Sequence, residues 1–189
     1  ITFSVSISMY FHIITNFGFD ISIPRKIAKN RADFDKISEL FCTVIIIKTF
    51  LMIISFLCLS ILIVLIDKLN QHYAIYLLSF GVVLGNVLFP VWFFQGMEKM
   101  KYISSINIIT RSIFTLMIFL VVNDIDDIIY VPLLNAIGHI VAGIYSLFLI
   151  HKKFPIIYKI PKIDNILIEI KESFEVFISR VSNKGSRFF

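Results

Sequence analysis

Polar and charged residues recur at helical spacing inside stretches of the chain that are otherwise strongly apolar. One series, spaced by three, four and four residues, consists of Ser104, Asn107, Arg111 and Thr115. Residues spaced in this way share one face of a helix. An arginine or lysine near the centre of a membrane helix costs ~2.5–3.5 kcal/mol to insert and commonly marks a pathway. We therefore interpret Arg111, and also Lys48 in an earlier apolar stretch, as candidates for lining such a pathway.

Other apolar stretches carry similar polar faces. These faces consist of Ser4, Ser8, His12, Asn16 and Asp20 in the first stretch, Ser79 and Asn86 in the third, and Asn135, His139 and Ser146 in the fifth. Several helices with one polar face each predict a bundle around a hydrated, partly cationic cavity, lined by Arg111, Lys48, Asn107, His139 and Asn135. Two alternatives stay open. Small polar side chains often hydrogen-bond between helices, and Lys48 is near enough to its helix end to extend to the membrane interface.

The sequence contains none of the common enzyme motifs. It has no GxGxxG, Walker loop, HExxH, CxxC or GxSxG. Its four histidines are scattered without the spacing of metal ligands, so we expect no metal site, no cofactor and no enzyme activity. Cys42 and Cys58 are sixteen residues apart on one helix, which separates them by ~24 Å at 1.5 Å per residue. They cannot form a disulfide with each other.

Composition places the chain in a membrane. Hydrophobic residues make up 58% of the sequence and charged residues 16%, and the mean hydropathy is +0.88. A soluble domain is about 45–50% apolar and about 25% charged. The net charge is +5, but the basic residues lie between the apolar stretches and form no contiguous patch, so nucleic acid is not an expected partner. The predicted fold class is an all-α, polytopic transmembrane helix bundle.

Apolar stretches long enough to cross a bilayer recur along the chain. They predict five spans near residues 1–20, 41–66, 73–94, 103–122 and 128–150, with a sixth that starts near Phe174 and no soluble domain between them. Gly81 and Gly85 form a GxxxG spacing that favours close helix packing. Pro24 predicts an interruption after the first span, followed by a short amphipathic segment. Trp92, Phe93, Phe94 and Tyr102 are interpreted as an interfacial aromatic belt.

Basic residues predict the orientation of these spans. Twelve lysines and arginines lie in one set of alternating loops, and only Lys68 lies in the other. Because such loops stay on the cytoplasmic side, residues 21–40, 95–102 and 151–173 are predicted to be cytoplasmic. The chain begins at Ile1 inside an apolar stretch, with no signal peptide pattern before it. We therefore expect residues before position 1 to be missing.

Six stretches of the chain follow a pattern known from one family of membrane proteins: 16–22 (NFGFDIS), 24–31 (PRKIAKNR), 36–41 (KISELF), 89–100 (FPVWFFQGMEKM), 171–173 (KES) and 177–182 (FISRVS). In these stretches the chain resembles Wzx-type O-antigen flippases of the multidrug/oligosaccharidyl-lipid/polysaccharide exporter superfamily. The resemblance implies a twelve-helix fold in two lobes around a central cavity, of which this chain is an incomplete N-terminal lobe. After Ser182 the sequence turns polar, where such flippases continue with an apolar helix.

The resemblance also implies a function. Members of the flippase family move undecaprenyl-pyrophosphate-linked O-antigen or polysaccharide repeat units across the bacterial inner membrane, with membrane lipid and other O-antigen assembly proteins as partners. Arg25 and Arg180 would add positive charge to the cavity. Three alternatives stay open. They are a drug or metabolite exporter of the same superfamily, a truncated inactive product, and a membrane enzyme of the same pathway, which would ordinarily carry a large external loop.

Overall fold

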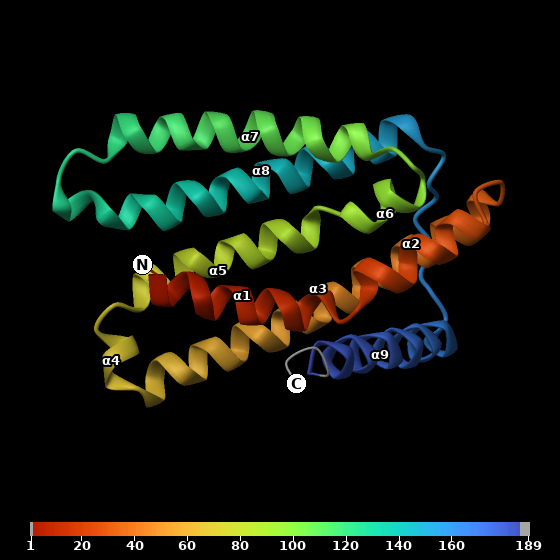
Figure 1. Cartoon of the computed structure of the whole chain (residues 1–189), viewed down its shortest axis with the longest axis horizontal. Coiled ribbons are helices and arrows are strands. Elements are labelled where there is room, and N and C mark those ends of the chain that lie inside the picture. The colour runs from red at the N-terminus through yellow and green to blue at the C-terminus, as the bar shows by residue number, and fades with distance from the viewer. Residues whose placement is uncertain (1, 186–189) are drawn as a thin grey trace.

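The computed structural model describes residues 2–185, and the side chains of residues 3–124 and 127–179 (Figure 1). This part of the chain is helical and contains no strand, which confirms the all-α prediction. The elements are α1 (Thr2–Asn16), α2 (Phe19–Lys29), α3 (Phe34–Leu65), α4 (Asp67–Asn70), α5 (Tyr73–Leu88), α6 (Val91–Gly96), α7 (Met100–Val121), the 3₁₀ turn η1 (Ile125–Ile129), α8 (Tyr130–Lys153) and α9 (Ile163–Gly185).

Four helical stretches of the described chain are long and apolar enough to cross a membrane. They are Phe34–Leu65, Tyr73–Gly96, Met100–Val121 and Asp127–Lys153, and they correspond to four of the predicted spans. The helix α1 has 15 residues. Phe174 lies inside α9, which begins at Ile163. Spans near 1–20 and from Phe174 onward stay predictions.

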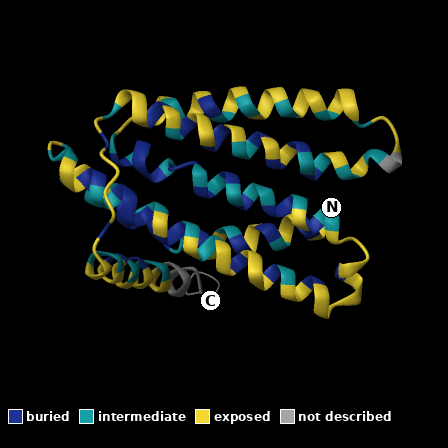
Figure 2. Cartoon of the chain, turned by 180° about the vertical axis from the view of Figure 1, so that it is seen from behind, coloured by how far each residue is buried: buried dark blue, intermediate teal, exposed yellow. Residues whose placement is uncertain are grey.

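The long helices lie side by side, with α5 near the middle of the bundle. In Figure 1, α7 and α8 form the upper pair, and α1 and α3 run below α5. The helix α5 packs against α8 on one side and α1 on the other, and α7 packs against α8. Most of α7 is exposed (Figure 2), as expected of a helix that faces lipid. The bundle therefore has α5 as a shared wall between two helix pairs.

Glycines allow α5 and α8 to approach closely. A Cβ atom on Gly81 would lie 2.6 Å from the Cβ of Ala136, and one on Gly85 would lie 2.5 Å from the Cβ of His139. Real Cβ atoms do not come this close, so a larger residue at either position would push the helices apart. The GxxxG spacing on α5 therefore serves packing, as the sequence predicted.

The first helix ends earlier than Pro24. Phe17 and Gly18 take positive φ angles of 42° and 81°, and α2 begins at Phe19 with Pro24 inside it. The prediction of an interruption at Pro24 was therefore wrong. A left-handed glycine ends a helix at little steric cost, so the break falls at Gly18, six residues before the proline.

The aromatic residues after α5 are buried. Trp92, Phe93 and Phe94 are each 0% exposed and belong to the core that α2, α3 and α6 share, where Phe41 contacts both Trp92 and Phe93. The prediction of an interfacial belt was wrong for these three residues. An aromatic run looks the same in sequence whether it faces lipid headgroups or a protein core. Here α2 packs on α6, and this packing buries the run in the core.

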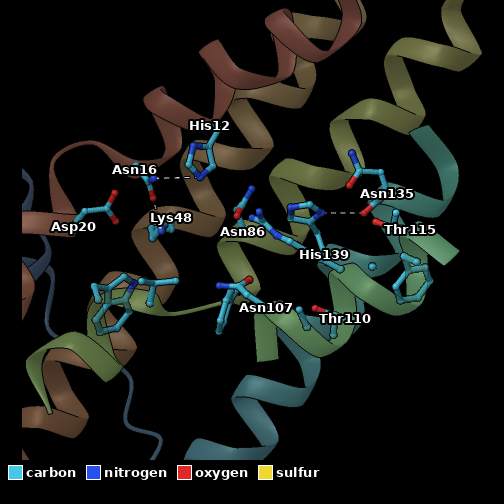
Figure 3. Close-up of a pocket in the computed structure, with 18 of the residues that line it drawn as sticks. His12, Asn16, Asp20, Lys48, Asn86, Asn107, Thr110, Thr115, Asn135 and His139 are labelled. Atoms are coloured by element: carbon cyan, nitrogen blue, oxygen red, sulfur yellow. Dashed lines mark hydrogen bonds between the residues drawn. The ribbon is translucent and has the colours of Figure 1, made fainter. Parts of the chain in front are cut away.

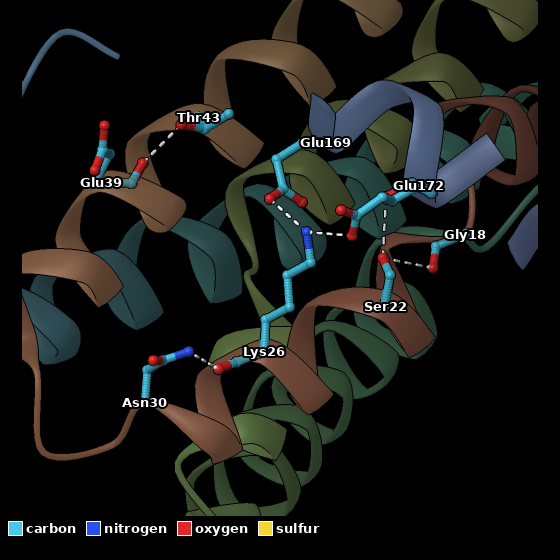
Figure 4. Close-up of polar contacts among 9 residues, drawn as sticks. Gly18, Ser22, Lys26, Asn30, Glu39, Thr43, Glu169 and Glu172 are labelled. Carbon is cyan, nitrogen blue, oxygen red and sulfur yellow. Dashed lines mark hydrogen bonds and ion pairs between the residues drawn. The ribbon is translucent and has the colours of Figure 1, made fainter. Parts of the chain in front are cut away.

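Polar contacts hold α9 against α2 (Figure 4). The Lys26 Nζ lies 2.6 Å from Glu169 Oε1 and 2.6 Å from Glu172 Oε2. One turn away, the buried hydroxyls of Ser22 and Ser173 are 3.0 Å apart. Burial lowers the pKa of Lys26, but hydrogen bonds and charge interactions with the two carboxylates outweigh burial and raise that pKa. We call these five residues the α2–α9 clasp.

Candidate functional site

A polar cavity of about 530 Å³ lies between the two helix pairs (Figure 3). Residues of α1, α2, α3, α5, α6, α7 and α8 line it. Its polar lining residues are His12, Asn16, Asp20, Lys48, Asn86, Gln95, Asn107, Thr110, Arg111, Thr115, Asn135 and His139. This volume is within the range of about 300–1,000 Å³ that is usual for ligand sites.

One wall carries a short chain of hydrogen bonds around Lys48. The Lys48 Nζ donates to Asn16 Oδ1 at 2.7 Å, and Asn16 Nδ2 lies 3.2 Å from His12 Nε2. Lys48 is only 2% exposed, so its side chain points inward and does not extend to the helix end. The alternative in which Lys48 reaches the interface is therefore wrong. Asp20 lies close enough to attract this ammonium group electrostatically, but the two form no ion pair.

The opposite wall comes from α7 and α8. Asn107, Arg111 and Thr115 line the cavity from one face of α7, as their spacing predicted, whereas Ser104 lies outside it. From α8, Asn135 and His139 line the same wall, and the His139 Nδ1 is 2.9 Å from the backbone oxygen of Asn135. The helical spacing of the polar residues thus turns one polar face of α7 and one of α8 towards the cavity.

The basic side chains that line the cavity have hydrogen-bond donors without partners in the described part of the chain. Lys48 and Arg111 are basic and Asp20 is the one carboxylate among the lining residues. Neither Arg111 nor Asp20 forms an ion pair within the described part of the chain. Lys48 has a single, neutral hydrogen-bond partner. Cations with unused donors on two facing walls can bind an anion that accepts hydrogen bonds from both.

Five of the seven candidate residues come together in this cavity. They are Lys48, Asn107, Arg111, Asn135 and His139. Arg25 is exposed on α2 and does not line the cavity. The backbone of Arg180 belongs to α9, and its side chain lies outside the described residues.

Other lining residues were absent from the candidate set. His12, Asn16, Asp20 and Asn86 belong to polar stripes that the sequence did reveal, so their helical spacing was a sufficient signal. Trp92, Gln95 and Thr110 were missed. Gln95 and Trp92 lie on the six-residue helix α6, which is too short to show a periodic pattern. In the described residues, no three His, Cys, Asp or Glu side chains group closely enough to hold a metal ion.

Four apolar helices of spanning length and a polar cavity between them define a polytopic α-helical membrane protein. More narrowly, the chain belongs to the family described as polysaccharide biosynthesis protein, whose family model matches residues 1–188. This result confirms the resemblance seen in the sequence.

Two curated relatives agree with this family. The chain is 29% identical over 171 residues to a protein of Escherichia coli (strain K12) named "Putative O-antigen transporter". The aligned region covers 90% of this chain and 41% of that protein. It is 26% identical over 183 residues to a protein of Shigella dysenteriae with the same name, and this aligned region covers 96% of this chain and 45% of the relative. The chain therefore spans less than half the length of these relatives. No solved structure matches it significantly.

Proposed function

We propose that the protein that carries this chain transports polysaccharide repeat units across the bacterial inner membrane, bound to undecaprenyl pyrophosphate. The polar cavity holds the diphosphate and sugar headgroup while the prenyl chain stays in lipid. The observation that carries the proposal is the facing pair of basic side chains, Lys48 on α3 and Arg111 on α7, in one cavity. The names of the curated relatives agree with this function.

The chemistry of the headgroup suits this lining. A diphosphate accepts several charge-assisted hydrogen bonds, and such bonds are about twice as strong as neutral ones. Sugar hydroxyls accept and donate, and the cavity offers amides of both capacities in Asn86, Asn107 and Asn135. A buried lysine is costly unless it is compensated, so an anion that enters the cavity would offset part of the cost of burying Lys48. The cavity is therefore selective for a polar anion over an apolar or cationic compound.

The orientation follows from the basic loops. Residues 21–40, 95–102 and 151–173 are proposed to face the cytoplasm, because twelve lysines and arginines lie there and one lies in the alternate loops. The α2–α9 clasp and the helix α6 then belong to the cytoplasmic end of the bundle. Lipid-linked repeat units would enter from that side and leave at the end where Asp124 and Asp127 lie.

An export assay tests this proposal. The complete protein is expressed in a bacterial strain that lacks its own repeat-unit exporter, and surface polysaccharide is measured by immunoblot and by flow cytometry. Restored surface polysaccharide is the expected result. If surface polysaccharide is absent while efflux of a cationic dye increases, the chain belongs to a drug exporter and the proposal fails. Absence of both activities would indicate an inactive product and would also contradict the proposal.

A further inference from the structure

Asp20 is the only carboxylate among the described residues that line the polar cavity. It lies in the first turn of α2, near Lys48 and Asn16 in the close-up of the site (Figure 3). Its side chain accepts no hydrogen bond and forms no ion pair within the described part of the chain. An unpaired carboxylate in a partly buried site costs free energy. Packing alone therefore does not account for a charged residue at this position.

The cation near Asp20 is Lys48, which Asn16 holds. Lys48 Nζ donates to Asn16 Oδ1 at 2.7 Å. Because that oxygen accepts from Lys48, the Asn16 amide nitrogen donates to His12 Nε2 at 3.2 Å, so both ends of the amide have partners. Asp20 acts on the same ammonium group electrostatically. Lys48 is thus attracted by a carboxylate while a neutral amide keeps the two charges from pairing.

A break between two helices separates Asn16 from Asp20. Asn16 is the last residue of α1, and Phe17 and Gly18 take positive φ angles before α2 begins at Phe19. In an uninterrupted helix residues 16 and 20 would be neighbours on one face. The break places them on different helices, so the hydrogen bond that anchors Lys48 to α1 does not bring Asp20 into contact with it.

An anion in the cavity would be attracted by the two basic residues and repelled by Asp20. Lys48 and Arg111 line facing walls, and Asp20 lines the same space. Like charges repel more strongly in a site of low dielectric than in water. The carboxylate therefore weakens anion binding. In a transporter this effect is useful, because a site that holds its substrate too tightly cannot let it leave.

We propose that Asp20 promotes release of the substrate by lowering the affinity of the cavity for its diphosphate group. The carboxylate attracts Lys48 and repels the phosphate oxygens, so it opposes the contact between the two. Asp20 is a positioning residue that sets how long the headgroup stays in the cavity. This inference rests on the proposed function, since it concerns the same cavity and the same substrate.

Binding and export measured together test the role of Asp20. Asp20→Asn keeps the size of the side chain and removes its charge. Inorganic pyrophosphate should therefore bind the complete purified protein about tenfold more tightly, while export of repeat units in the exporter-deficient strain falls at least about threefold. A merely structural role would weaken both. Unchanged or weaker pyrophosphate binding, or tighter binding with undiminished export, would overturn the proposal.

Two further variants separate charge from shape. Asp20→Glu keeps the charge, so it should bind pyrophosphate less tightly than Asp20→Asn; equal affinity of the two would overturn the proposal. The matched control for loss of a carboxylate is Asp67→Asn, because Asp67 is exposed on α4 and does not line the cavity. The control should stay within about twofold of wild type in both measurements. The same gain in affinity from Asp67→Asn would reflect net charge alone and would also overturn the proposal.

The wild-type protein distinguishes failure of this inference from failure of the proposed function. Wild-type protein that binds no pyrophosphate would contradict the proposed function, and the role of Asp20 would fall with it. If wild type binds pyrophosphate and Arg111→Ala weakens that binding, the anion site stands. Absence of any gain from Asp20→Asn would then overturn the role of Asp20 alone.

Discussion

The Lys48 ammonium donates a 2.7 Å hydrogen bond to the side-chain oxygen of Asn16 and has no carboxylate partner among the described residues. A buried lysine held by one neutral amide is a strong site for an incoming anion, because an anion would remove much of its desolvation cost. Arg111, on the facing wall, has no partner in the described chain and offers all its donors. The two basic residues therefore differ in how much of their binding capacity is free.

Arg111→Ala should reduce export more than Lys48→Ala. Lys48 already shares a hydrogen bond with Asn16, whereas each donor of Arg111 is available to the substrate. We expect export to fall at least about tenfold for Arg111→Ala, as for the loss of a charge-assisted contact of ~1.5–3 kcal/mol. Surface polysaccharide, normalised to the amount of protein in the membrane, measures the effect. Arg25→Gln is the control, since Arg25 is exposed outside the cavity. Wild-type export in both cavity variants would contradict the claim that Lys48 and Arg111 bind the substrate.

Asn16→Asp should stabilise the protein and impair export. The new carboxylate would replace the amide that Lys48 contacts and pair with the buried ammonium, which lowers its cost in the folded state. The new ion pair would also make the Lys48 ammonium group unavailable to the substrate. Thermal unfolding in detergent and surface polysaccharide measure the two effects. An increase in both stability and export would show that Lys48 does not bind substrate.

Lys26→Met should destabilise the contact between α2 and α9. It leaves Glu169, whose side chain is 11% exposed, without its positive partner, at a cost of about 1–3 kcal/mol. Lys29→Met, on the exposed side of α2, is the control and should unfold like wild type. The combination of Lys26→Glu with Glu169→Lys should recover part of the loss. Equal unfolding temperatures for Lys26→Met and the control would show that the clasp contributes nothing.

The clasp should also lose its contribution at alkaline pH. The pKa of Lys26 is raised in the folded protein, because the two carboxylates outweigh burial. A raised lysine pKa gives stability that is complete below the unfolded pKa and disappears as pH rises through the folded pKa. The difference in unfolding temperature between wild type and Lys26→Met should therefore be constant near neutral pH and shrink in alkali. A difference that instead grew with rising pH would contradict this account.

Gly18→Ala should destabilise the break between α1 and α2. Gly18 has φ 81°, and an added Cβ would lie 2.6 Å from the backbone oxygen of Ser173. The left-handed conformation alone costs an alanine about 1–2 kcal/mol, and the contact with α9 adds to this. Gly18→Asn tolerates the φ angle but not the close contact. If the two variants unfold at the wild-type temperature, α9 does not pack against Gly18.

Local patterns predicted the helices and much of the cavity. The spacing from Asn107 to Thr115 was sufficient to place three side chains on one face of α7, because helical periodicity is a property of the local chain. The same reasoning found the stripe of His12 and Asn16. It could not show that Asn16, rather than Asp20, is the partner of Lys48, because that choice depends on how α1 packs on α3.

Tertiary packing decided what the sequence could not predict. Trp92, Phe93 and Phe94 have the composition of an interfacial belt, yet they are completely buried in a core that also contains residues of α2, α3, α7 and α8. Pro24 is a strong helix breaker in sequence, but Gly18 with its positive φ ends α1 first. The ion pairs of Lys26 join residues more than 140 positions apart, and no periodic pattern links such distant residues.

Direct binding of a lipid-linked saccharide tests the central claim that Lys48 and Arg111 hold a diphosphate headgroup. The affinity of undecaprenyl-diphosphate-linked N-acetylglucosamine for the complete purified protein would be measured in detergent by thermophoresis, for wild type, Arg111→Ala and Arg25→Gln. We predict that Arg111→Ala weakens binding at least about tenfold, that Arg25→Gln stays within about twofold of wild type, and that inorganic pyrophosphate competes. Equal affinity of all three proteins, or no competition by pyrophosphate, would contradict the claim.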